Sequence, residues 1–170
     1  MISCNKTSKF TKKNYLHILF LLVAGLFLIW QLIPDGAWFG SETDWYSQHM
    51  TIADYMRKNF YATGQLFPDF TGLGGGTNFF SLSYYGFMRP DVLLSYFFPS
   101  VPVAYFLQGY AIFEILLGCT LLYYWLHQKR ISDFTVLVCS FFYLCANCMF
   151  QSHRQIMFVN YLPFALMALI

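Results

Sequence analysis

Three polar side chains that could do chemistry stand together in the stretch SETDWYSQHM, residues 41–50. Asp44 and Gln48 are four residues apart, so on a helix they lie on one face, and Glu42 precedes Asp44 by two positions. A carboxylate there can act as a general base on a hydroxyl, or hold a divalent cation that neutralises a phosphate leaving group. The alternative is that Glu42 and Asp44 only place favourable negative charge at a helix N-terminus.

The composition predicts that these side chains are held beside a lipid bilayer. Of the 170 residues, 58% are hydrophobic, 22% aromatic and 11% charged, whereas ordinary soluble domains have roughly 25% charged residues. The net charge of +2 is small, and the basic residues stand mostly at the ends of apolar runs. We therefore expect no nucleic-acid partner, and instead lipids or lipid-linked molecules.

The apolar runs predict an all-α polytopic membrane protein with three complete transmembrane helices and the start of a fourth. The complete helices are expected at residues 15–33, 103–126 and 131–150, and the fourth at 156–170. The first run is too long for the core of a cleavable signal peptide, so we interpret it as a retained span. The fourth is short for a crossing, which we interpret as the N-terminal part of a longer protein.

The positive residues predict the orientation of these helices in the cell membrane. Short flanks rich in Lys and Arg remain in the cytoplasm, which places the tail 1–14 and the link 127–130 inside. Residues 34–102 and the link 151–155 are then external. The basic residues that decide this are Lys6, Lys9, Lys12, Lys13, Lys129 and Arg130.

The external loop 34–102 is where we expect the site. Apolar residues recur at helical spacing from about residue 43 to 60, which predicts an amphipathic helix on the membrane surface. A glycine-rich turn follows, which could approach a sugar or a lipid phosphate closely or could be a plain connector. No Gly-Lys-Ser/Thr follows it, so it is not a nucleotide-binding loop. The apolar run 92–98 is too short to span, and predicts a re-entrant or interfacial segment.

Three stretches of this loop together resemble the start of the bacterial YfhO family of membrane proteins: GSETDWYSQHMTIADYMRKNF, GQLFPDFTGLGGGTNFF and SYYGFMRPDVLLSYFFP. The resemblance implies a membrane-embedded glycosyltransferase of the GT-C type. Such an enzyme takes sugar from a polyprenyl-phosphate donor and transfers it to a cell-envelope polymer such as teichoic or lipoteichoic acid. It also implies a catalytic acidic residue shortly after the first span, which Asp44 matches best and Glu42 next, with Gln48 beside it.

Further residues are candidates for binding the substrate or for a polar site within the membrane. Glu114 lies mid-span, where a charge costs about 2.5–3.5 kcal/mol, so it is either functional or hydrogen-bonded between helices. Cys145 and Cys148 are read as apolar filling, with neither metal nor disulfide, and no cofactor is expected beyond a divalent cation that Asp44 could hold. The substrate-binding candidates are Gln48, Gly74, Gly75, Asn78, Arg89 and Arg154.

Two other classes of protein compete with an enzyme. A transporter or permease subunit would build its site near the membrane midplane from broken helices and polar residues. Of the eight acidic residues, only Glu114 lies at depth, with Asp133 at the cytoplasmic edge of the third predicted span. The other six lie in the external loop, which favours an enzyme that works at the outer surface. A non-catalytic scaffold for envelope assembly has no positive feature in its favour.

Overall fold

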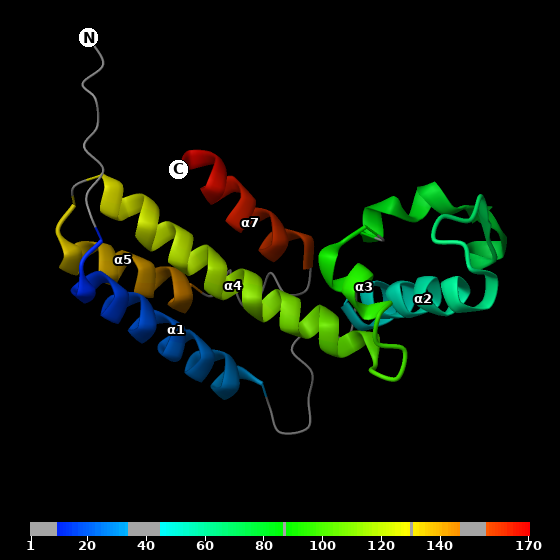
Figure 1. Ribbon diagram of the computed structural model, residues 1–170, viewed down its shortest axis with the longest axis horizontal. Helices are drawn as coiled ribbons and strands as arrows, with labels where there is room; N and C mark the ends of the chain where they lie inside the picture. Colours follow the sequence, from blue (N-terminus) through cyan, green and yellow to red (C-terminus); the bar gives the residue numbers. More distant parts are fainter. Residues whose placement is uncertain (1–9, 34–44, 87, 130, 147–155) are drawn as a thin grey trace, which may run out of the picture. The chain divides into compact units, whose positions relative to one another are not determined.

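The computed structural model describes residues 10–33, 45–86, 88–129, 131–146 and 156–170, and these are mostly helical (Figure 1). The chain divides into two compact units. Unit 1 contains residues 1–39 and 111–170, and unit 2 contains residues 40–110. The long helix α4 (Val103–Gln128) begins in unit 2 and continues through unit 1.

Unit 1 contains the first predicted membrane helix and most of the second. Helix α1 (Lys12–Leu32) begins after Thr11, whose side chain forms a reciprocal cap with Asn14. In the described part of the chain, α1 and α4 are the two helices long and apolar enough to cross a membrane. The predicted helices 15–33 and 103–126 are thereby confirmed as apolar helices, with ends that differ by up to three residues.

The third predicted span is not confirmed as a complete crossing. Helix α5 (Asp133–Cys145) has 13 residues, which at about 1.5 Å per residue is roughly 20 Å, against about 30 Å of bilayer hydrocarbon. Residues 147–150 of the predicted span lie outside the described residues. Helix α7 (Ile156–Leu169) starts where the fourth apolar run was expected, and contains Pro163.

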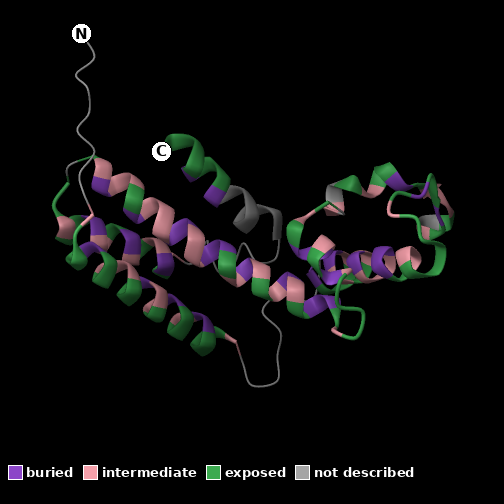
Figure 2. Ribbon diagram, in the orientation of Figure 1, coloured by how far each residue is buried: buried purple, intermediate pink, exposed green. Residues whose placement is uncertain are grey.

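The helices of unit 1 pack tightly along one side of α1 and leave its other sides open. A side-chain carbon at Gly25 would lie 2.6 Å from Leu116 of α4 and 3.3 Å from Leu144 of α5, so glycine allows the three helices to approach closely. Figure 2 shows the buried residues of α1 as a narrow stripe. Leu19, Val23 and Phe27 are more than half exposed, as expected of a helix that faces lipid.

Unit 2 begins with the predicted amphipathic helix, in two parts. A π-helical segment, η1 (Trp45–Met50), leads into the α-helix α2 (Thr51–Thr63), which ends at Gly64 in the left-handed conformation. The side chains of Trp45, His49 and Met56, which recur at the predicted helical spacing, are buried. That this helix lies on a membrane surface stays a prediction. The helix extends three residues beyond the predicted end, and residues 43–44 of its predicted start lie outside the described part.

The glycine-rich stretch folds into a small hairpin, so this chain is not purely α-helical. Strands β1 (Phe70–Thr71) and β2 (Thr77–Asn78) pair antiparallel around a single 3-10 turn, η2 (Leu73–Gly75). A longer 3-10 helix, η3 (Phe79–Tyr85), follows. The short helix α3 (Pro90–Ser95) then leads through tight turns to the start of α4.

Candidate functional site

The predicted site residues fall into three groups in the structure. Glu42, Asp44 and Arg154 lie outside the described residues. Glu114 lies on α4 in unit 1. The remaining candidates all lie in unit 2: Gln48, Gly74, Gly75, Asn78 and Arg89.

The π-helical segment η1 starts one residue after Asp44. Trp45 and His49 are 2% and 4% exposed, so both rings are held inside unit 2. The Thr51 hydroxyl donates a 2.9 Å hydrogen bond to the carbonyl of Tyr46, five residues earlier. π-Helical turns are rare and are found frequently at functional sites. The helical spacing that placed Asp44 above Gln48 assumed an α-helix, and here the α-helix begins only at Thr51.

Gln48 connects η1 to the segment that follows the glycine-rich hairpin. The Tyr85 hydroxyl donates a 3.1 Å hydrogen bond to Oε1 of Gln48. The Tyr85 ring also packs edge-on against His49, with ring centroids 5.8 Å apart. Tyr85 ends η3, so an amide, an imidazole and a phenol from segments some 37 residues apart meet at one place.

The glycine-rich hairpin is hydrogen-bonded to α2, the helix that follows η1. The backbone N–H of Gly72 donates a 3.1 Å hydrogen bond to the Tyr55 hydroxyl of α2. Gly75 has a φ of 85°, which favours glycine because a side chain would be strained there. Gly74 lies in the same turn. Asn78 has a structural role, since its side-chain oxygen accepts a 2.8 Å hydrogen bond from Phe80 N–H and caps η3.

Arg89 is held by a partner within the chain. Its guanidinium donates two hydrogen bonds to the carboxylate of Asp91, with Nε 3.1 Å from Oδ1, and lies 5.9 Å from the centre of the Tyr110 ring. The Arg89 side chain is 14% exposed. Burial raises the pKa of the Asp91 carboxyl above its usual 3.8, although the Arg89 charge opposes this. A substrate phosphate would compete with Asp91 for this guanidinium.

Sequence reasoning missed two residues of unit 2. Arg57 is 6% exposed, and its guanidinium reaches backbone carbonyls of residues 95–101. Tyr85 stands in an aromatic stretch of the sequence and was not predicted as a site residue. The burial of Arg57 could have been predicted from helical spacing, because Arg57 stands four residues after Ala53 and next to Met56, which are both buried on α2. No local pattern distinguishes Tyr85 from its aromatic neighbours.

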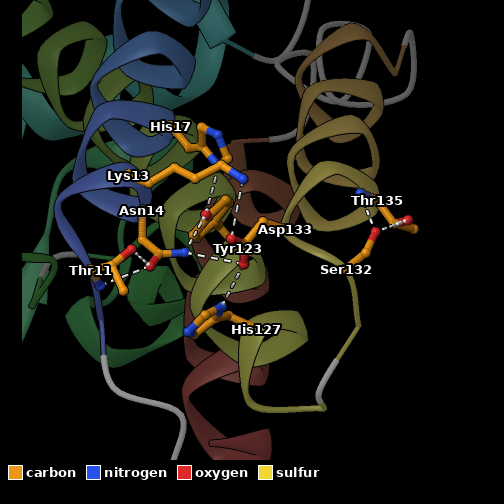
Figure 3. Close-up of polar contacts among 9 residues, drawn as sticks. All are labelled: Thr11, Lys13, Asn14, His17, Tyr123, His127, Ser132, Asp133 and Thr135. Carbon is orange, nitrogen blue, oxygen red and sulfur yellow. Dashed lines mark hydrogen bonds and ion pairs between the residues drawn. The ribbon is translucent and has the colours of Figure 1, made fainter.

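Unit 1 contains Glu114 and a separate polar network. Glu114 is 2% exposed, so its side chain is enclosed by the protein; whether it is functional or hydrogen-bonded between helices stays a prediction. The network joins the start of α1 to the end of α4 and the start of α5 (Figure 3). Asn14 Nδ2 donates to Tyr123 Oη at 3.0 Å, and His17 Nδ1 also lies 3.0 Å from that oxygen. Asp133 Oδ2 lies 3.5 Å from Lys13 Nζ, and Asp133 Oδ1 lies 3.6 Å from His127 Nδ1.

This network fastens three helix ends at the end of unit 1 that was predicted to be cytoplasmic. Among the described residues, no group of three or more His, Cys, Asp or Glu side chains is placed to hold a metal ion. We interpret the network as structural, because its hydrogen bonds and ion pairs join three helix ends.

Comparisons with known proteins found no matching family model, no matching curated protein and no matching solved structure. The described residues thus define a mostly helical chain with two helices, α1 and α4, that are long and apolar enough to cross a membrane. Residues 40–110, which include the first part of α4, form a compact unit of their own.

Proposed function

We propose that the chain is the N-terminal part of a membrane-embedded, GT-C-type glycosyltransferase that transfers sugar from a polyprenyl-phosphate donor to a cell-envelope polymer. The observation that carries the proposal is the hydrogen bond from Tyr85 to Gln48. It brings the segment after Asp44 together with the segment after the glycine-rich hairpin, which are two of the three stretches in the resemblance to the YfhO family.

The side chains at this place suit a sugar. Amide and hydroxyl groups exchange hydrogen bonds with sugar hydroxyls, and aromatic rings offer apolar faces beside them. Gln48 is partly buried, and Tyr46 beside it is 64% exposed. Phe70 and Phe80 on the hairpin and η3 are also more than half exposed. A pocket of few polar groups among aromatic side chains is typical of small-molecule sites.

In the proposed reaction Asp44, which directly precedes η1 in the sequence, is the general base. Its carboxylate takes the proton of an acceptor hydroxyl, whose oxygen attacks the anomeric carbon of the sugar. The bond from that carbon to the phosphate oxygen breaks, and polyprenyl phosphate leaves with the electron pair. In the second form of the proposal, Asp44 holds a divalent cation that stabilises the leaving phosphate. Glu42 is the next carboxylate if Asp44 has neither role.

The test replaces Asp44 by Asn, which keeps the shape of the side chain and removes its charge. Loss of a general base lowers the rate by roughly 10² to 10⁴, whereas loss of a helix-terminal charge costs about 0.3–1 kcal/mol of stability and little activity. Sugar incorporation into envelope polymer is measured at matched protein levels in the membrane. Asp69→Asn, in an exposed residue of the same unit, is measured in parallel, because Asp69 and Glu42 are the next carboxylates to test if Asp44→Asn is normal. Near-normal incorporation by Asp44→Asn would remove Asp44 from the reaction.

A transporter subunit is the second candidate, and the observation that favours it is the burial of Glu114 in an otherwise apolar helix. Buried carboxylates within membrane helices mark ion and substrate pathways in transporters. The two candidate functions, glycosyltransferase and transporter subunit, predict different effects of Glu114→Gln on activity. Loss of solute uptake with normal sugar transfer would favour a transporter.

A further inference from the structure

The segment that connects α3 to α4 exposes large apolar side chains. Phe97 is 78% exposed, Leu94 is 52% and Phe98 is 48%. They stand together at the end of α3 and in the turn after it, only a few residues before α4 begins at Val103. A cluster of this kind marks a surface that contacts a partner or a membrane.

The backbone donors of this segment are largely satisfied within the chain. The N–H groups of Phe97, Phe98 and Val101 each donate to the carbonyl three residues earlier, at 3.1, 3.2 and 3.1 Å. Pro99 and Pro102 have no N–H group at all. Few donors are therefore left that need water.

The carbonyls of the same segment receive side-chain donors from α2. Arg57 Nη1 lies 2.6 Å from the Val101 oxygen and 3.5 Å from the oxygens of Ser95 and Phe98. The Tyr61 hydroxyl donates to the Tyr96 carbonyl. In a turn that faces water, these carbonyls would be hydrated without any such help. In hydrocarbon, each polar backbone group must find a partner within the protein, because an unsatisfied group costs several kcal/mol.

The occupant that fits these side chains is lipid. Helix α4 is long and apolar enough to cross a membrane, and the segment leads directly into its first turn. The Phe98 ring stacks on Phe106 of α4, with ring centroids 5.8 Å apart. Tyr105 on the same turn is 57% exposed. The exposed apolar surface is thus continuous with a helix that would itself stand in the bilayer.

We propose that residues 94–101 form a wedge that inserts into the hydrocarbon of the bilayer, and that Arg57 and Tyr61 make this insertion possible by satisfying its carbonyls. Arg57 remains buried beneath the wedge as its internal donor. The proposal goes beyond the proposed function, since it holds whether or not the chain transfers sugar.

The first experiment places a nitroxide label at Phe97→Cys in the full chain with its native cysteines replaced. The control label is at Gln65→Cys, an exposed polar position of the same unit. Both proteins are reconstituted in vesicles of phosphatidylcholine and phosphatidylglycerol. Oxygen collects in hydrocarbon and a neutral nickel chelate in water, so we expect position 97 to meet oxygen and position 65 to meet the chelate. If the chelate reached both positions, or if neither reagent reached position 97, the proposed insertion of residues 94–101 into hydrocarbon would be wrong.

The second experiment tests the role of Arg57 with the label kept at position 97. Arg57→Met removes the donor, and we expect access of the nickel chelate to position 97 to rise several-fold as water follows the unsatisfied carbonyls. Lys58→Met is the matched control, because the Lys58 side chain is 76% exposed. Unchanged access in a folded Arg57→Met protein would overturn the role of Arg57. If the Arg57→Met protein does not fold, the first experiment still tests the insertion of residues 94–101. The role of Arg57 is then tested with Arg57→Lys, which keeps a charged N–H donor group on a shorter reach: chelate access to position 97 should rise, and unchanged access would overturn the role of the guanidinium.

Discussion

The hydroxyl of Tyr85 donates a 3.1 Å hydrogen bond to the side-chain oxygen of Gln48, across 37 positions of sequence. The two residues belong to different helical segments, η3 and η1, and the glycine-rich hairpin lies between them in the chain. The buried His49 ring packs against Tyr85 at the same point. This contact decides which side of η1 packs against η3.

Tyr85→Phe removes this hydrogen bond and keeps the ring. We expect a loss of stability of about 1 kcal/mol, the usual net contribution of one hydrogen bond. If the pair positions a sugar, transfer to envelope polymer should fall about tenfold, the effect of about 1.4 kcal/mol on a barrier. Tyr15→Phe, at an exposed position of α1, is the control for loss of a hydroxyl. Equal activity of the two variants would contradict a role for Tyr85 in positioning.

Asp91 should make stability depend on pH. Its folded-state pKa is raised above 3.8, mainly by burial, so the folded protein holds the proton more tightly than the unfolded chain does. The contribution of Asp91 to stability is therefore greatest below pH 3.8 and falls as the pH rises through the folded-state pKa. Asp91→Asn removes this dependence. Thermal unfolding across acidic pH should show wild type losing stability relative to Asp91→Asn as the pH rises, and the opposite slope would show that Arg89 outweighs burial.

Glu114→Leu tests why an acidic residue is buried in an apolar helix. If the carboxyl group has a partner among the helices or works in a cavity, a leucine of similar size should lower stability or activity, because it abolishes hydrogen bonding. Glu114→Gln, which keeps hydrogen bonding without charge, separates the two cases. Detergent thermal unfolding and sugar transfer are measured for both. A leucine variant normal in both assays would show that Glu114 has neither role.

Gly25→Ala should destabilise unit 1. The added carbon would lie 2.6 Å from Leu116, so α1 or the leucine must shift, at a cost of about 1–3 kcal/mol. Gly109→Ala is the matched control, since a carbon there meets nothing within 4 Å, and alanine favours a helix by up to about 1 kcal/mol. Opposite changes in the unfolding temperature of the two variants are expected. A Gly25→Ala protein as stable as wild type would mean that the close approach of α1 contributes little.

The positive residues predict that unit 2 faces outward. A single cysteine at position 65 should react with a membrane-impermeant maleimide in intact cells, whereas one at position 129 should react only after the membrane is opened. Labelling in the reverse order would contradict both the orientation and the proposed transfer from an external lipid-linked donor.

The sequence alone determined the elements that depend on local pattern. An apolar run of sufficient length predicts a membrane helix wherever it lies, and α1 and α4 formed where those runs are. The helical spacing of Trp45, His49 and Met56 likewise matches the buried side of the helical segment 45–63. Such features depend on residues within a few turns of each other, so no knowledge of the rest of the fold is needed.

The tertiary structure decided which polar groups meet. The buried Arg57 guanidinium contacts backbone carbonyls some 40 residues later in the chain, and nothing in its local sequence names those partners. Arg89 looked available for a phosphate, yet Asp91 and Tyr110 hold it. The contact of Tyr85 with Gln48 has no local signature either. A hydrogen bond between distant segments forms only once packing brings them together, because the directions of both side chains are set by the elements that carry them.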